Sequence, residues 1–250
     1  MTSPLSIESS TGYARARVGL IIPSSNRLSE PQFRRFLPAD VAVHVTRLRM
    51  TGKHSKPLGP LLVDVAQAAG ALGDAKCDVI VFHCTANSME HGLEGERKIL
   101  DAIVAASGAQ ALSTAQAVVE AFRASNIKKL VMISPYVQSH NDHEKDYLAA
   151  LGFETVHDVA LKLPPSDGYL AFPPAQWIEV ARANARAEAD GYFLSCTNTT
   201  QIDVICALET AFNKPVVNSN QATIWAALKR ISGKLGVAPS IPGLGGLMLR

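Results

Sequence analysis

The chain has 250 residues, of which 47% are hydrophobic and 18% charged, and its formal net charge at pH 7 is +2. This composition can bury a full core and excludes a disordered chain, while the scattered charges exclude a nucleic-acid-binding stripe or a membrane-binding patch. No apolar run approaches the roughly 20 residues of a membrane span. Residues 1–16 lack the apolar centre of a secretory signal, so we expect a flexible N-terminal tail and a cytoplasmic protein.

Short runs rich in apolar and β-branched residues predict strands along the whole chain. They lie at residues 17–23, 41–50, 77–83, 109–113, 128–134, 153–161, 190–195 and 214–219. Alanine-rich segments with helical spacing separate most of them, for example 61–75, 115–125, 141–152, 175–189 and 221–232. Strands that alternate with such helices predict an α/β protein, and their nearly continuous apolar character predicts a mainly parallel sheet covered on both faces.

Matching residues recur along the chain at a nearly constant offset. An offset of 112 residues relates Pro23 to Pro135, Asp78 to Asp190, and Cys84 to Cys196. Further on, STAQA at 113–117 resembles NSNQA at 218–222, with an offset of 105. Four coincidences in the same order indicate two pseudo-symmetric α/β halves. We place the first half at 17–116 plus 222–250 and the second at 117–221.

Small polar residues follow three strands in each predicted half. The first half has PSSN at 23–26, CTANS at 84–88 and STAQ at 113–116, and the second has SPY at 134–136, CTNTT at 196–200 and NSNQ at 218–221. Ligands of α/β sheets bind outside the carboxyl ends of the strands. We therefore expect a ligand site between the halves, with substrate-binding residues among these ends: Ser25, Asn26, Thr85, Ala86, Tyr136, Thr197 and Asn198.

Two of the four cysteines occupy equivalent strand ends. The cysteines show neither C-x-x-C spacing nor nearby paired histidines, so we expect no metal site, and we assign Cys77 and Cys206 to the core. Ser, Thr or Asn after a strand is explained by helix capping, but cysteine is not a favoured cap. A thiol at a helix N-terminus has a lowered pKa. We expect Cys84 and Cys196 to act from opposite sides of one small molecule as nucleophile, base or acid.

These motifs resemble a known family. The resemblance is carried by VGLIIPSSN at 18–26, CTANS at 84–88, STAQAVVEAFRA at 113–124, ISPY at 133–136, SCTNTTQIDVICALE at 195–209 and KPVVNSNQATIWAALK at 214–229. The chain is similar to the Asp/Glu/hydantoin racemase superfamily, and within it to the branch of maleate cis–trans isomerases and arylmalonate decarboxylases. The resemblance implies two flavodoxin-like parallel-sheet halves with the active site between them.

The resemblance also implies roles for individual residues. Cys84 matches the nucleophile that adds to the double bond, and Cys196 matches the cysteine that supplies or removes a proton on the opposite side. Asn26 and Tyr136 match residues that hold a substrate carboxylate. The isomerases carry an asparagine in the loop after the sixth strand. Ser166 lies nearest that position here, with Asp167 and Tyr169 as alternatives, and this is a departure from the family. Arylmalonate decarboxylases keep only the second cysteine.

Three functions follow as alternatives. The first is a cis–trans isomerase of a maleate-like dicarboxylate that needs no cofactor, because addition of a thiolate converts the double bond into a single bond that turns freely. The second is a racemase, or an arylmalonate-type decarboxylase, acting at a carbon next to a carboxylate. The third is a non-catalytic carboxylate binder. In each case we expect a small carboxylate ligand, no nucleic acid or membrane partner, and a homo-oligomer.

Other polar segments receive structural interpretations. SHNDHEKDY at 139–147 is interpreted as the solvated start of a helix with Asn141 or Asp142 as its N-cap. His83 alternates with Cys84 along the strand, so we expect it on the opposite face. The glycine-rich residues 242–250 precede no helix and are interpreted as a terminal tail.

Overall fold

The computed structural model describes residues 14–50, 55–236 and 241–250. The predicted tail therefore lies almost entirely outside the described residues, and the first strand begins at Ala16. All eight predicted strands are present, each with ends within a few residues of the prediction. Their bounds are β1 Ala16–Pro23, β2 Val41–Leu48, β3 Val79–Phe82, β4 Gln110–Ser113, β5 Lys129–Ser134, β6 Glu154–Ala160, β7 Gly191–Leu194 and β8 Val216–Asn218.

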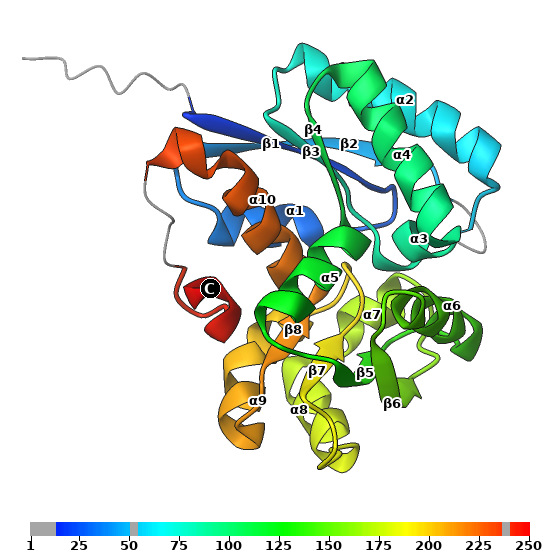
Figure 1. Ribbon diagram of the computed structural model, residues 1–250, viewed down its shortest axis with the longest axis vertical. Coiled ribbons are helices and arrows are strands. Elements are labelled where there is room, and N and C mark those ends of the chain that lie inside the picture. The colour runs from blue at the N-terminus through cyan, green and yellow to red at the C-terminus, as the bar shows by residue number, and fades with distance from the viewer. Residues whose placement is uncertain (1–13, 51–54, 237–240) are drawn as a thin grey trace, which may run out of the picture.

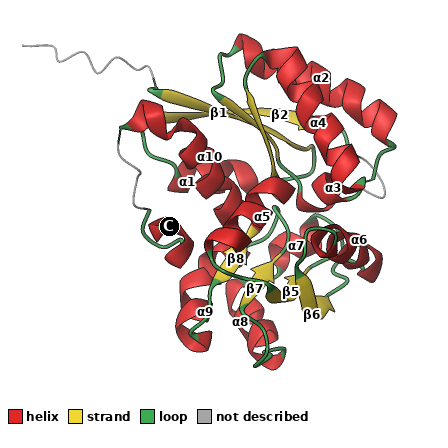
Figure 2. Cartoon of the chain, viewed as in Figure 1, coloured by secondary structure: helices red, strands yellow, loops and turns green. Residues whose placement is uncertain are grey.

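Helices alternate with these strands, as the apolar spacing predicts (Figure 2). The fourth predicted helix is shorter than expected and ends at Ala183. The α-helices are α1 Ser29–Phe36, α2 Leu58–Asp74, α3 Thr85–Met89, α4 Gly92–Ser107, α5 Thr114–Ala124, α6 Gln138–Ala149, α7 Asp167–Ala171, α8 Pro174–Ala183, α9 Ile205–Phe212 and α10 Ser219–Leu235. Short 3₁₀ helices lie at Gln201–Val204, before α9, and at Gly246–Leu249, near the C-terminus. No described helix has both the length and the apolar character needed to cross a bilayer.

The strands form two separate four-stranded parallel sheets of the same topology. The first has the order β2-β1-β3-β4, and the second has β6-β5-β7-β8. Figure 1 shows the first sheet above the second, with α5 and α10 lying between them. These two helices pack against each other and continue from β4 and β8. The α/β fold with two parallel sheets is confirmed, whereas the exact boundaries of the two halves stay a prediction.

Equivalent side chains support equivalent backbone in the two sheets. The carboxylate of Asp78 accepts a 2.8 Å hydrogen bond from the Arg17 N–H, and that of Asp190 accepts one of 2.8 Å from the Lys129 N–H. Each aspartate precedes the third strand of its sheet and ties it to the first. The repeat seen in the sequence therefore reflects a repeated local structure.

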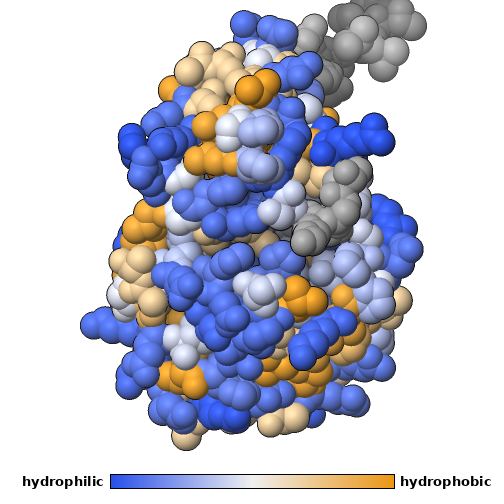
Figure 3. All heavy atoms as spheres, turned by 90° about the vertical axis from the view of Figure 1, so that its right-hand side faces the viewer, coloured by the Kyte–Doolittle hydropathy of each residue, from blue (hydrophilic) through white to orange (hydrophobic). Residues whose placement is uncertain are grey.

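Both faces of the first sheet are buried. Alternate residues of β1 point to opposite faces of the sheet. Leu20 and Ile22 join the core on the side of α10, and Ile21 joins the core on the side of α2 and α4. This alternation explains why the strand is an unbroken apolar run in the sequence. Figure 3 views the molecule from the side that lies to the right in Figure 1, where the surface is largely hydrophilic with apolar residues in scattered patches.

The C-terminal segment differs from the expected loose tail. Leu244 and Leu247 are buried in the main core. The Gln221 side chain donates a 2.7 Å hydrogen bond to the Leu244 carbonyl, and the Trp225 indole donates one of 3.3 Å to the Arg250 carbonyl. The segment thus covers α10 of its own chain, because its leucines supply apolar surface that this helix buries.

Candidate active site

A cavity of about 530 Å³ lies where strands of both sheets end. Its volume falls in the range of small-molecule sites. Both Cys84 and Cys196 line it, so the two cysteines related by the repeat face one shared space. The remaining lining residues are Pro23, Ser25, Asn26, Ser55, Ala86, Asn87, Glu90, Tyr136, Val137, Ser139, His140, His143, Leu163, Pro165, Ser166, Tyr169, Thr197 and Asn198.

Cys84 lies between the end of β3 and the start of α3. Its thiol is 2.9 Å from Oδ1 of Asn87, which accepts the S–H. Burial raises the pKa of the thiol to about 12, although the Asn87 backbone N–H opposes that rise. The lowered pKa expected from a helix N-terminus is therefore not what the structure has. The helix is only five residues long, and the removal of water outweighs its amides.

Cys196 follows β7 and is 3% exposed. Its backbone φ is +138°, a conformation that residues with a side chain rarely adopt and that costs about 1–3 kcal/mol. Burial raises the pKa of this thiol to about 12 as well, against hydrogen bonds from Tyr136 and from backbone N–H groups. The N–H of Asn198 is 3.3 Å from the sulfur. The strained backbone holds the thiol against these donors.

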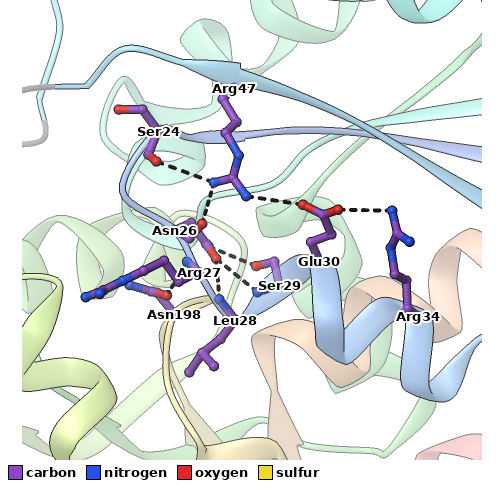
Figure 4. A network of polar contacts seen from close by, with 9 residues as sticks. All are labelled: Ser24, Asn26, Arg27, Leu28, Ser29, Glu30, Arg34, Arg47 and Asn198. Carbon is purple, nitrogen blue, oxygen red and sulfur yellow. Dashed lines mark hydrogen bonds and ion pairs between the residues drawn. The ribbon is translucent and has the colours of Figure 1, made fainter.

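The turn at 24–29 joins the two halves beside Cys196. The side-chain nitrogen of Asn26 donates to Ser29 Oγ at 2.8 Å and to Thr197 Oγ1 at 3.1 Å. The Arg47 guanidinium bonds the Asn26 carbonyl at 2.5 Å, and the Arg27 N–H donates to Asn198 Oδ1 at 2.9 Å (Figure 4). Asn26 therefore occupies the predicted place, but a bound carboxylate would compete with Ser29 and Thr197 for its amide.

The structure gathers nearly all the predicted site residues around the cavity. Thr85 differs, because its side chain is fully buried and its hydroxyl donates a 2.8 Å hydrogen bond to Ser219 Oγ. Ser166, nearest the position of the isomerases' asparagine, reaches the lining with a φ of +62° just before α7. The lining residues that match the prediction are Ser25, Asn26, Cys84, Ala86, Tyr136, Ser166, Cys196, Thr197 and Asn198.

The interpretation of 139–147 as a solvated helix start was wrong. The helix begins at Gln138, and His140 and His143 line the cavity. Asn141 and Glu144 are fully buried rather than solvated. With Leu148 they repeat at helical spacing along the buried face of α6. Because Asn141 and Glu144 are polar, they give no apolar pattern in the sequence, and only Tyr147 and Leu148 mark this face as buried.

Asn87 and Glu90, which had no predicted role, also line the cavity, as does Tyr169, one of the alternatives to Ser166. The Asn87 side chain donates a 3.1 Å hydrogen bond to Glu90 Oε2. The ring of Tyr169 lies edge-on to that of Tyr136, with 5.9 Å between centroids. No Lys or Arg is among the described residues of the lining, whose side-chain donors are hydroxyl, amide, thiol and imidazole groups.

Two similar half-folds, each placing one of its cysteines at a shared small cavity, define a class of α/β proteins with a two-cysteine site. The family model described as arylmalonate decarboxylase matches residues 18–243, and the chain belongs to this family.

Individual relatives cover nearly the full chain. A maleate isomerase of Pseudomonas putida is 27% identical, over 93% of this chain and 96% of its own. An arylmalonate decarboxylase of Bordetella bronchiseptica is 23% identical, over 92% and 95%. Among solved structures, a mutant maleate cis–trans isomerase of Nocardia farcinica with a covalently bound succinylcysteine intermediate has a TM-score of 0.84 at 24% identity, over 93% and 98%. These structural matches confirm the fold.

Proposed function

We propose that this chain is a cis–trans isomerase of a maleate-like unsaturated dicarboxylate. The observation that carries the proposal is the pair of thiols, Cys84 and Cys196, in one cavity between the sheets. Maleate isomerases are among the full-length relatives, and one structural relative holds a succinyl group on a cysteine. A dedicated decarboxylase of the kind that the resemblance describes would need only the second thiol.

The proposed reaction follows from bond orders. The Cys84 thiolate forms a bond from sulfur to one alkene carbon, and the π electrons move onto the carboxylate attached to the other carbon. The enediolate takes a proton from Cys196, which leaves a succinyl thioether with a central single bond that rotates. Return of the proton to Cys196 and breakage of the carbon–sulfur bond give the trans diacid. Each thiol ends as it began, so the reaction consumes no oxidant, reductant or cofactor.

Neutral hydrogen-bond donors would stabilise the enediolate. We assign one carboxylate to Asn26, Ser25 and the Tyr136 hydroxyl, with Thr197 and Asn198 beside them. Such donors act on charge that develops during the reaction, and each typically contributes about 2.7–4 kcal/mol of barrier lowering. Ser166 lies where a second carboxylate would reach the loop before α7. Thr85 acts only indirectly in this scheme, through its bond to Ser219.

Proton NMR with maleate tests the proposal directly. Wild type should convert maleate to fumarate, and both Cys84→Ala and Cys196→Ala should abolish turnover. The matched control is Cys206→Ala, because Cys206 is an exposed free thiol outside the cavity lining. The assignment of Cys206 to the core was therefore wrong, whereas Cys77 is buried as predicted. An active Cys84→Ala variant, or no fumarate from any wild-type preparation that binds maleate, would refute the proposal.

A decarboxylase is the second candidate, because the matching family model carries that description. An arylmalonate with the wild type in deuterium oxide separates the two. Release of carbon dioxide with one solvent deuterium in the product, surviving in Cys84→Ala but lost in Cys196→Ala, would favour a decarboxylase. Solvent deuterium entering an amino acid without carbon loss would identify a racemase. A protein that binds carboxylates and turns over none would be a binder.

The proposal includes a homo-oligomer in the cytoplasm. All four cysteines are free, which suits a reducing compartment. Light scattering coupled to size exclusion measures the oligomeric state against the monomer mass of 26.7 kDa.

A further inference from the structure

We propose that Asn87, oriented by Glu90, is a positioning residue that keeps the resting proton of the pair on Cys84 and leaves Cys196 as the first thiol to ionise. For catalysis this inference rests on the proposed function. The Cys196 thiolate takes the proton of Cys84 as the Cys84 sulfur adds to the alkene, and the Cys196 thiol formed in this way then protonates the enediolate. The contacts themselves do not depend on the identity of the substrate.

The orientation of the Asn87 amide follows from its second partner. Nδ2 of Asn87 donates to Glu90 Oε2 at 3.1 Å, and Ser55 donates to the other carboxylate oxygen. An ionised carboxylate only accepts hydrogen bonds. The amide therefore turns its NH₂ toward Glu90 and its oxygen toward Cys84, where Oδ1 lies 2.9 Å from Sγ.

An oxygen acceptor favours the thiol over the thiolate. A protonated Cys84 donates its S–H to Oδ1, but a thiolate there would face the lone pairs of that oxygen at the same distance. Asn87 is 3% exposed, so packing keeps its side-chain oxygen beside the partly buried Cys84. The Asn87 backbone N–H has the opposite effect, because its hydrogen bond stabilises the thiolate and lowers the pKa of Cys84.

The surroundings of Cys196 are different. Its sulfur receives the Asn198 N–H at 3.3 Å, and hydrogen bonds from Tyr136 and the Thr197 N–H lower its pKa. Among the described residues, the side-chain oxygen of Asn87 accepts the proton of Cys84, whereas the contacts of Cys196 are donors to its sulfur. The two positions that the repeat makes equivalent are thus chemically unequal, since one offers an acceptor and the other offers donors.

Other ionisable groups face both sulfurs. A negative charge on Glu144, which approaches from α6, raises the pKa of either thiol, and Tyr136 and Tyr169 are electrostatically coupled to both. His140 and His143 belong to the same lining. The Asn87 side chain contacts Cys84, and the charge of Glu90 raises the pKa of Cys84. Together with the donors at Cys196, these two groups make the thiols unequal.

Alkylation of the substrate-free, full-length protein tests this inference. The rate of iodoacetamide modification of each cysteine would be followed against pH by mass spectrometry of its peptide, because the midpoint of that profile reports thiolate formation. In the wild type the Cys196 midpoint should lie below the Cys84 midpoint. Asn87→Leu removes the acceptor and keeps a side chain of similar size. The pH midpoint of Cys84 alkylation should therefore fall by about one unit, so that below the midpoint Cys84 is alkylated about tenfold faster than in the wild type.

The conservative variant distinguishes positioning from simple packing. Asn87→Asp keeps an oxygen beside the sulfur and adds negative charge, so the Cys84 midpoint should stay at or above that of the wild type. Asn184→Leu is the matched control, because Asn184 bonds Val180 and His157 outside the cavity lining, and its midpoints should equal the wild type. Should Asn87→Leu lose its cooperative melting transition, Asn87→Ala takes its place.

An unchanged Cys84 midpoint in the folded Leu or Ala variant would overturn the inference, as would an equal fall in Asn87→Asp. So would a wild-type Cys84 that ionises before Cys196. These readouts need no substrate. If the midpoints move as expected while maleate is not isomerised, the assignment of Asn87 stands and the proposed function fails.

Discussion

The carboxyl group of Glu144 accepts a 2.6 Å hydrogen bond from Oγ of Ser195, the residue before Cys196. Glu144 is fully buried on α6, and burial raises the pKa of its carboxyl group to about 8. The group is therefore largely neutral at pH 7. This contact ties α6 to the end of β7 and so supports the strained backbone that presents the Cys196 thiol.

Glu144→Gln should change how stability depends on pH. In the native state the carboxyl keeps its proton up to about pH 8, whereas the unfolded chain loses it near the ordinary value of 4.5. The unfolding free energy of the wild type therefore falls as pH rises through this window, by at most about 1.4 kcal/mol per pH unit. Glutamine keeps an oxygen for Ser195 and removes the titration.

Urea denaturation at pH 5, 6.5 and 8 measures this effect. The stability of Glu144→Gln relative to the wild type should increase from pH 5 to pH 8. Glu94→Gln, at an exposed position beside Lys98, is the control for loss of a surface charge. Parallel stability curves for the wild type and Glu144→Gln would show that Glu144 is ionised in the folded protein.

His83 should contribute a pH dependence of the opposite sign. Its ring is fully buried between Thr114 Oγ1 at 2.9 Å and Asn220 Oδ1 at 2.8 Å, and burial lowers its pKa to about 3. Between about pH 6.5 and 3 the unfolded chain binds a proton that the native state does not, so acid destabilises the native state through this group.

His83→Gln removes that titration. Melting temperatures at pH 7, 5.5 and 4.5 should show the deficit of the variant shrinking as the pH falls. His157→Gln, at a partly exposed site in β6, serves as the control. A deficit that stays constant with pH would indicate that His83 is protonated in the native protein.

Asn26→Ala should lower turnover more than it lowers stability. The substitution removes the proposed carboxylate donor and the hydrogen bond to Thr197. We expect the barrier to rise by about 2.7–4 kcal/mol, a loss of roughly 10²–10³ in kcat. Fumarate formation over a range of maleate concentrations measures kcat and KM, with Asn184→Ala as the control. A wild-type kcat in Asn26→Ala would remove Asn26 from the site.

Tyr136→Phe should move the pH dependence of activity. The Tyr136 hydroxyl bonds Cys196 and lowers the pKa of that thiol, so without it the thiolate forms at higher pH. The acidic limb of the kcat/KM profile should shift upward by about one pH unit. Tyr192→Phe, whose hydroxyl accepts the Arg186 N–H far from the cavity, should keep the wild-type profile. A profile unmoved in Tyr136→Phe would contradict the assigned contact.

Local patterns in the sequence determined much of the fold. The apolar runs predicted all eight strands, because a strand buried on both faces is apolar at every position. The repeat of 112 residues predicted two similar halves, and the Asp78 and Asp190 contacts show why those positions match. Strand ends are local features too, so the cysteines and Asn26 were placed at the cavity correctly.

Only the tertiary structure decided the chemistry around the thiols. Glu144 and Ser195 are 51 residues apart, and His83 and Asn220 are 137 apart, so neither pair leaves a local signal. The sequence also predicted a lowered pKa at Cys84, since it shows a helix start but not the depth of burial. Desolvation and hydrogen bonding depend on which distant segments exclude water from a group. Those segments meet only when the chain is folded.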